Sequence, residues 1–180
     1  MYLNHESLTT LPFPNTKLEL ARPNDAAFIN ALRANVTLNA YVSHVENDVD
    51  AQKEWLLKYL EREQKGQEYY FIIRNNNDAL GTVRLYDFDE NIFRWGSWMI
   101  LPNAPIKTAL ESMLNLYYLA FDVLNFEITH IDVRNDNKKV LSIHKKMGCK
   151  VIEVSEFDTV LELSVTDYNK CKDKFYRILR

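Results

Sequence analysis

The apolar residues of this chain follow two different periods, one typical of strands and one typical of helices. Residues 17–21 alternate polar and apolar side chains, as a half-buried strand does. After position 105 the apolar residues instead recur three and four positions apart, which predicts a long helix reaching about Leu124. The apolar face of this helix consists of Ile106, Ala109, Leu110, Met113, Leu116, Tyr117, Ala120, Phe121 and Leu124. We take it as the central helix of the fold.

The same patterns predict the elements before and after this helix. Residues 1–15 form an irregular lead-in, and two helices follow the first strand, one ending near Asn35 and one spanning 50–64. The turn residues at 75–78 and 89–91 separate strands at 68–74, 79–88 and 92–100, which predicts an antiparallel meander. Beyond the central helix we expect a strand at 127–133, a helix at 138–147, strands at 149–154 and 157–165, and a C-terminal helix.

Length and composition limit the possible classes of protein. A chain of 180 residues suits one domain, 1–180, with a full hydrophobic core. A net charge of -3 argues against a nucleic-acid partner, which would require a basic surface. Cys149 and Cys171 are too few and too far apart for a disulfide scaffold or a metal cluster, so we expect no metal.

The chain also lacks the usual signs of a membrane or secreted protein. No run approaches the roughly 18 apolar residues that a membrane span needs. The first residues have neither the basic start nor the apolar block of a secretion signal. We therefore expect a cytoplasmic protein without a membrane partner.

The junction between residues 92–100 and the central helix could bind an anion. A strand that enters a helix through a short loop leaves free backbone N–H groups at the helix start, where the dipole also favours negative charge. A pyrophosphate could bind there, and Lys107 and Thr108 would strengthen the site. The alternative is that this is one of the strand-loop-helix units found in any α/β protein.

Several short motifs stand out along the chain, namely Arg22-Pro23, Gly81–Tyr86, the strand centred on Gly96, Ala120-Phe121, Asp132–Asn137 and His144–Gly148. In their order and spacing they resemble the GNAT superfamily of acetyl-coenzyme A (acetyl-CoA) dependent N-acyltransferases. The resemblance covers roughly residues 17–165 and is greatest to the ribosomal-protein acetyltransferases and the bacterial amino-sugar acetyltransferases. It implies an α/β (α+β) fold with a mixed, mostly antiparallel sheet of about seven strands, in which the fourth and fifth strands splay apart.

The resemblance implies that acetyl-CoA binds along the fourth strand and the start of the central helix. The main chain of Trp98, Met99 and Ile100 would pair with the pantetheine arm, and main-chain amides there would polarise the thioester carbonyl. The family's cofactor loop usually carries two small residues, and only Ala109 keeps that pattern. The remaining cofactor-binding residues that we expect are Lys107, Thr108 and Asn137, the last of which is also a helix cap.

Two residues are candidates for proton transfer. His144 stands where the family usually has a tyrosine that protonates the leaving thiolate, and its helical position borders the buried face. With an ordinary pKa near 6.5 it could act as the general acid, or it could be a packed histidine at a helix flank. Asp87 is the candidate general base, with a solvated carboxylate at a hairpin end as the alternative.

The acceptor would meet a mixture of guanidinium and aromatic groups on adjacent strands. Guanidinium groups bind phosphates bidentately and rings stack on nucleobases or sugars, although the same residues could simply pair across a half-exposed sheet. The loop at 36–49, with Tyr41 and His44, could also border a ligand. The predicted substrate-binding residues are Arg84, Tyr86, Arg94 and Trp95.

These features favour an N-acetyltransferase that moves an acetyl group from acetyl-CoA to a primary amine by direct attack in a ternary complex. The expected acceptor is a small molecule, such as a bacterial amino sugar or a nucleotide-linked amino sugar. A protein N-terminal amine is the alternative acceptor. The other alternative is a non-catalytic module that binds acyl-CoA or a partner, and the protein could be a monomer or a homodimer.

Overall fold

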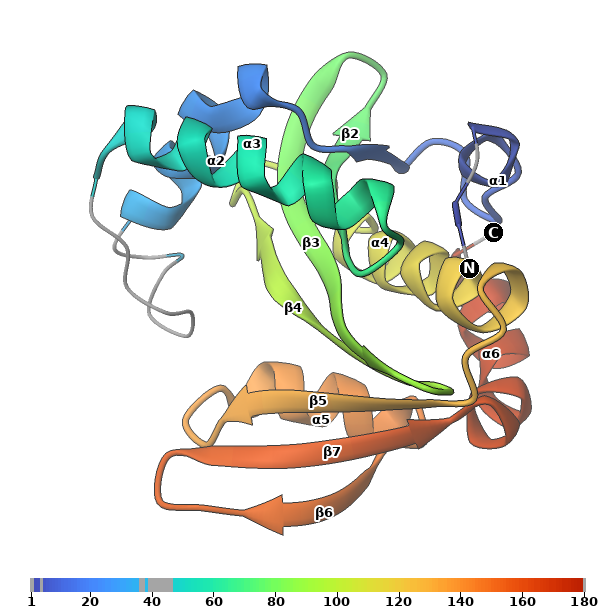
Figure 1. Cartoon of the computed structure of the whole chain (residues 1–180). Helices are drawn as coiled ribbons and strands as arrows, with labels where there is room; N and C mark the ends of the chain where they lie inside the picture. Colours follow the sequence, from blue (N-terminus) through green and yellow to red (C-terminus); the bar gives the residue numbers. More distant parts are fainter. Residues whose placement is uncertain (1, 4, 36–37, 39–46, 180) are drawn as a thin grey trace.

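The computed structural model describes residues 2–3, 5–35, 38 and 47–179. These residues form a seven-stranded sheet in the order β1-β2-β3-β4-β5-β7-β6, in which β4 and β5 are parallel and the other neighbours antiparallel (Figure 1). The predicted mixed, mostly antiparallel sheet is confirmed. The strands are β1 (Lys17–Leu20), β2 (Tyr69–Asn75), β3 (Asp78–Asp89), β4 (Ile92–Ile100), β5 (Ile128–Arg134), β6 (Lys150–Val154) and β7 (Asp158–Ser164). Tyr41 and His44 lie outside the described residues.

Helices cover both faces of this sheet. On one face, α2 (Ala26–Ala34) and α3 (Val49–Gln64) lie over β2, β3 and β4 (Figure 1). On the other face lie α4 (Thr108–Tyr117), the π-helical segment η3 (Tyr118–Val123), α5 (Lys138–Lys146) and α6 (Val165–Leu179). Two shorter helices, α1 (His5–Thr9) and η1 (Pro23–Asp25), flank β1.

The two faces have separate hydrophobic cores, and β2 contributes to both. Phe71 and Ile73 belong to the larger core with α4, α5 and α6, whereas Tyr70 and Ile72 belong to the smaller core with α2 and α3. This follows from the alternation of side chains along a strand. Because both of its faces are buried, β2 is continuously apolar rather than alternating.

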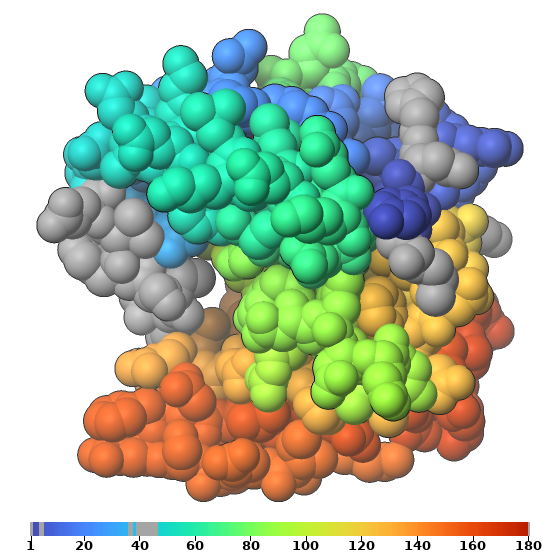
Figure 2. Space-filling view, in the orientation of Figure 1, coloured from blue at the N-terminus to red at the C-terminus, as the bar shows by residue number. Residues whose placement is uncertain are grey.

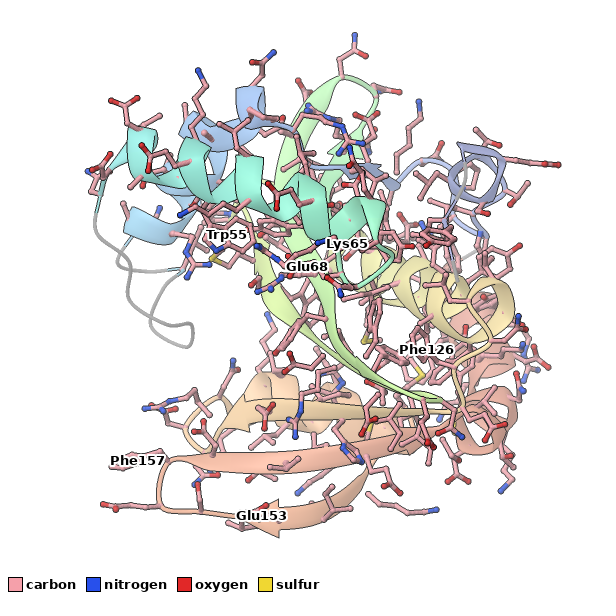
Figure 3. All side chains as sticks on the ribbon, in the orientation of Figure 1. Trp55, Lys65, Glu68, Phe126, Glu153 and Phe157 are labelled. Atoms are coloured by element: carbon pink, nitrogen blue, oxygen red, sulfur yellow. The ribbon has the colours of Figure 1, made fainter. Side chains whose placement is uncertain are left out.

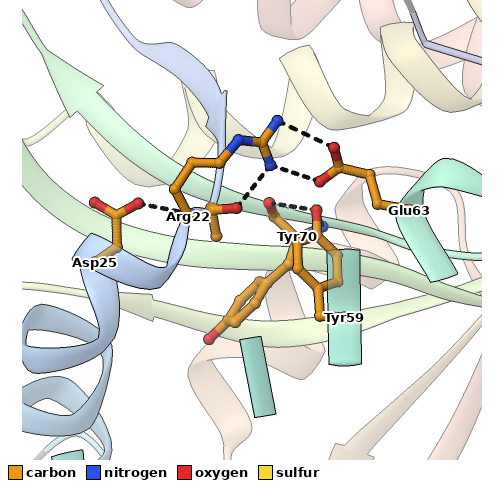
Figure 4. A network of polar contacts seen from close by, with 6 residues as sticks. Arg22, Asp25, Tyr59, Glu63 and Tyr70 are labelled. Atoms are coloured by element: carbon orange, nitrogen blue, oxygen red, sulfur yellow. Dashed lines mark hydrogen bonds and ion pairs between the residues drawn. The ribbon is translucent and has the colours of Figure 1, made fainter. Parts of the chain in front are cut away.

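A polar network fixes α3 on the sheet (Figure 4). The Arg22 guanidinium donates to both carboxylate oxygens of Glu63 at 2.8 and 3.0 Å, and its backbone N–H donates to Asp25. The hydroxyl of Tyr59 accepts the N–H of Tyr70 at 3.0 Å and lies 3.3 Å from its carbonyl oxygen. Burial raises the pKa of Tyr59, so this hydroxyl stays protonated and can keep both hydrogen bonds.

Two sequence predictions about these helices are wrong. The lead-in at 1–15 is not wholly irregular, because it contains α1. The central helix begins at Thr108, and Ile106 is 97% exposed instead of buried. The chain turns through 101–107 and the Thr108 N–H closes that turn on Pro105, so Ile106 precedes the helical face.

The second half of the central helix, η3, is a π-helix and not the α-helix that the pattern predicts. The N–H of Leu124 donates to the carbonyl of Leu119, five residues earlier. Leu119, Ala120 and Phe121 lie in this π-helical segment, and all three are buried.

The fourth and fifth strands separate, as expected. They pair only between Ile92–Arg94 and Ile128–His130. Further along β4, a bulge places Ser97 and Trp98 opposite the single residue Val83, and Ser97 has a φ of 49°. The bulge bends β4 away from β5, and the two strands therefore open into a wedge.

Candidate active site

The wedge between β4 and β5 contains a cavity of about 130 Å³, which we call the β4–β5 pocket. Figure 2 shows a recess on this side of the molecule, between the green strands and the orange C-terminal strands. The edge of β4 that faces β5 has no strand partner beyond Arg94 among the described residues. The described side chains that line the pocket include Trp95, Gly96, Ser97 and Trp98 of β4, Ile131–Arg134 of β5, and Asn137, Val140 and His144.

His144 is the titratable group on the α5 wall of this pocket. Its ring lies edge-on to Trp95, with centroids 5.4 Å apart, and tilted against Trp98 at 6.4 Å. The side chain is 1% exposed, and its Nδ1 has no hydrogen-bond partner among the described residues. Burial lowers the pKa of His144 to about 4. The imidazole is therefore neutral near pH 7, whereas the sequence suggested an unperturbed group.

This pKa makes stability depend on pH. Because the pKa of His144 is about 4 when folded and 6.5 when unfolded, the unfolded chain takes up the proton first as the pH falls. The stabilisation by the neutral imidazole is fully present above pH 6.5 and is lost as the pH falls from 6.5 to 4. The total loss in the free energy of unfolding is roughly 3 kcal/mol. Urea unfolding of the wild type and His144→Phe across this range measures it.

We expect the variant to lack this part of the acid destabilisation. His130→Gln is the matched control, because it removes a histidine of β5 that pairs with Glu162 at 3.2 Å and leaves His144 in place. Equal pH dependence in His144→Phe and the wild type would contradict the buried neutral imidazole.

The β4 residues expected to hold the cofactor arm lie at the open edge of the sheet. Met99 and Ile100 pair with Thr82 and Gly81 of β3 on one side only. The Trp98 indole N–H donates to the Ser112 hydroxyl of α4 at 3.2 Å, which fixes its ring beside His144. An extended pantetheine arm fits such an unpaired edge, because it can accept main-chain hydrogen bonds that β5 does not make.

The start of α4 differs in detail from the expected phosphate site. Lys107 donates through its ammonium group to the carbonyl of Leu179 at 2.5 Å, in the last turn of α6. Cations are favoured at the C-terminal end of a helix, so this contact ties the loop to α6. Thr108 is buried, and its hydroxyl has no hydrogen-bond partner among the described residues. Ala109 is half-buried in the first turn, next to this hydroxyl in the sequence.

Asn137 has the capping role that its position predicts. Its side-chain oxygen accepts the N–H of Val140 at 3.3 Å, at the start of α5. The same residue lines the β4–β5 pocket. Its contact with a cofactor stays a prediction.

Three of the four predicted acceptor residues share one face of the sheet. Tyr86 lies directly opposite Arg94, and Arg84 lies 4.8 Å above the Tyr86 ring. Arg94 forms an ion pair with Asp132 of β5. Trp95 alternates to the other face, where it is 2% exposed and packs edge-on to Tyr117. Trp95 therefore does not share the face of the other three, because neighbouring residues of a strand point to opposite faces. It lines the β4–β5 pocket, and its contact with an acceptor stays a prediction.

Sequence reasoning missed the residues that hold Arg84. Glu68, just before β2, binds Arg84 through two hydrogen bonds of 3.1 and 2.7 Å and binds Arg62 of α3 at 2.9 Å. The guanidinium groups of Arg62 and Arg84 lie 5.1 and 5.2 Å from the centre of the Trp55 ring. Figure 3 shows Trp55 and Glu68 below α3, facing the strands. No local pattern links these residues, which come from three separate elements.

Asp87, the predicted general base, does not line the β4–β5 pocket. It is exposed, has a φ of 51°, and lies at an irregularity of β3 between the pairs Tyr86–Arg94 and Asp89–Ile92. That end of β4 is the end paired with β5, away from the wedge.

The fold and the wedge agree with the family comparison. Residues 16–150 match the Acetyltransferase (GNAT) domain, so the chain belongs to the GNAT acetyltransferase family and is an acyltransferase. Members of this family use acetyl-CoA. No curated protein sequence is significantly similar to the chain. Within the described residues, no helix is long and apolar enough to cross a membrane.

Two solved structures illustrate the similarity. Apo FdhC, a nucleotide-linked sugar GNAT, is 40% identical, with a TM-score of 0.83 over 92% of this chain and 96% of its own. Spermidine N-acetyltransferase from Vibrio cholerae, in complex with CoA and spermine, is 17% identical, with a TM-score of 0.72 over 86% of this chain and 98% of its own. The second likeness is one of fold alone.

Proposed function

We propose that this protein transfers the acetyl group of acetyl-CoA to the amine of a nucleotide-linked amino sugar. The observation that carries the proposal is the 40% identity, along 92% of the chain, with a nucleotide-linked sugar GNAT. The guanidinium and aromatic groups of Arg84, Tyr86 and Arg94 on the acceptor face support it, because they suit phosphates and ring systems.

The described residues fit the thioester donor. The open edge of β4 at Trp98, Met99 and Ile100 would hold the pantetheine arm, and the amides at the start of α4, with Thr108 and Ala109, would face its pyrophosphate. Acetyl-CoA supplies the thioester whose C–S bond breaks as the new C–N bond forms.

His144 handles the proton in this proposal. As a neutral imidazole it can accept the proton that the attacking amine nitrogen loses, and it can give that proton to the departing sulfur. The main-chain amides at the Ser97 bulge polarise the carbonyl oxygen. Asp87 would need the acceptor amine to reach the paired end of β4, so we assign the proton transfer to His144.

The site does not favour a polyamine as acceptor. A cationic polyamine would need unpaired carboxylates. Among the acidic side chains on the acceptor face, Glu68 is paired with Arg62 and Arg84, and Asp132 is paired with Arg94. The face therefore offers fixed guanidinium groups rather than negative charge.

The direct test measures thiol release from acetyl-CoA in the presence of candidate acceptors. We expect release, with an acetylated product of the corresponding mass, for a nucleotide-linked amino sugar and none for the analogue with a hydroxyl in place of the amine. An N-terminal peptide and spermidine should give values of kcat/KM that are lower by a factor of at least about 100. Release with the peptide alone would favour a protein acetyltransferase. Binding of acetyl-CoA without release for any amine would favour the non-catalytic module.

A further inference from the structure

A second cavity, of about 420 Å³, lies beneath α3 and is called here the α3 pocket. Its size is in the range of small-molecule sites. Ser97, at the β4 bulge, lines both this cavity and the β4–β5 pocket. The lining residues are Arg33, Asp48, Ala51, Gln52, Trp55, Tyr70, Arg84 and Ser97.

The polar groups of this cavity are arranged for an anion. The Arg84 guanidinium is held by Glu68 through Nε and Nη2. Its Nη1 makes no hydrogen bond to another described residue. The Glu68 side chain is only 6% exposed and also binds Arg62, so it acts as an internal support that fixes the direction of Arg84. A guanidinium fixed in this way loses little conformational freedom when it binds a phosphate.

Aromatic groups surround the same guanidinium. The Arg84 guanidinium lies 5.2 Å from the centre of the Trp55 ring and 4.8 Å from the centre of the Tyr86 ring. Arg33 of α2 brings a second guanidinium to the cavity wall. Asp48 is the one carboxylate among the described lining residues. A pocket with two guanidinium groups and a tryptophan offers both charge and a flat apolar surface, as a nucleoside diphosphate requires.

From this arrangement we propose that the α3 pocket binds the nucleoside diphosphate of the acceptor. Arg84 and Arg33 bind the diphosphate, Trp55 packs against the nucleoside, and the amino sugar passes Ser97 into the β4–β5 pocket. This inference rests on the proposed function, since it divides one acceptor between the two cavities. It also assigns a role to Trp55 and Arg33, which no sequence motif marked.

Calorimetric titration of the full chain with uridine diphosphate and thymidine diphosphate, without acetyl-CoA, tests the site. We expect at least one of them to bind with a Kd below about 1 mM, and Arg84→Gln to weaken that binding at least about tenfold. Arg84→Gln should still fold, because Glu68 keeps Arg62 as its partner. The matched control is Arg177→Gln, which removes an exposed guanidinium of α6 outside the α3 pocket and should change Kd less than about threefold.

The outcomes separate this inference from the proposed function. If neither diphosphate binds while the amino sugar conjugate is acetylated, the α3 pocket is not the nucleotide site and the enzymatic proposal stands. Equal weakening by Arg84→Gln and Arg177→Gln would also overturn the inference, because it would show a general charge effect. Diphosphate binding that depends on Arg84, without any acetyl transfer, would support the site and contradict the proposed function.

Discussion

Replacement of His144 by phenylalanine should lower kcat about 10²- to 10³-fold, with little change in the affinity for acetyl-CoA. Phenylalanine keeps a ring against Trp95 and Trp98 but cannot accept or donate a proton. The orphaned Nδ1 also disappears, so the loss of rate should come without a loss of stability at neutral pH. Steady-state kinetics of thiol release, with a calorimetric Kd for acetyl-CoA, separates the two effects.

Two further variants make this prediction specific. His144→Tyr introduces the residue that the family usually has at this position and should recover part of the rate, because a phenol can also protonate the thiolate. Asp87→Asn should change kcat less than about threefold, since Asp87 is exposed at the paired end of β4 and asparagine accepts its positive φ. A wild-type kcat for His144→Phe would remove His144 from the mechanism, and a large loss for Asp87→Asn would restore the carboxylate as the base.

Gly81→Ala should destabilise the folded protein by about 3 kcal/mol or more, the largest stability effect that we expect of a single methyl group. A Cβ built on Gly81 would lie 2.2 Å from the carbonyl oxygen of Met99, which is main chain and cannot rotate away. The two strands would have to separate at the position where β3 supports the cofactor edge of β4. Urea unfolding at neutral pH measures the loss as a lower midpoint with an unchanged slope.

Gly96→Ala is the matched control for this effect. Its Cβ would lie 3.2 Å from the Tyr86 hydroxyl, at the end of a side chain that can move. We expect a loss below about 1 kcal/mol, accompanied by weaker acceptor binding because Tyr86 is displaced. Equal destabilisation by the two substitutions would show that the close approach of β3 and β4 at Gly81 is not the cause.

Elements that depend on local sequence were predicted well. The turn residues at 89–91 and the run that follows them predicted a strand at 92–100, and β4 has these boundaries. Asn137 was identified as a helix cap, and its side chain accepts the Val140 N–H at the start of α5. These features depend on residues within a few positions of one another, where hydrogen bonding and backbone preference act directly.

The candidate site was predicted only in part, because its geometry depends on distant segments. The sequence indicated His144, but its pKa near 4 follows from its burial on α5 against Trp95 and Trp98 of β4. It indicated Arg84, but not the buried Glu68 that holds this arginine or the Trp55 ring beside it. Lys107 has the charge expected of a phosphate ligand, yet its ammonium group reaches the carbonyl of Leu179, 72 positions along the chain.

The sequence by itself therefore determined the order of the strands and of the longer helices, the family resemblance, and which residue types stand near the splayed strands. Tertiary structure alone decided that Trp95 faces the core, that Ile106 is exposed, and that Ser97 lines two cavities. The physical reason is that hydrophobic periodicity fixes the face that a single element buries. The protonation of a side chain and the partners of a charge depend on which other elements pack against it.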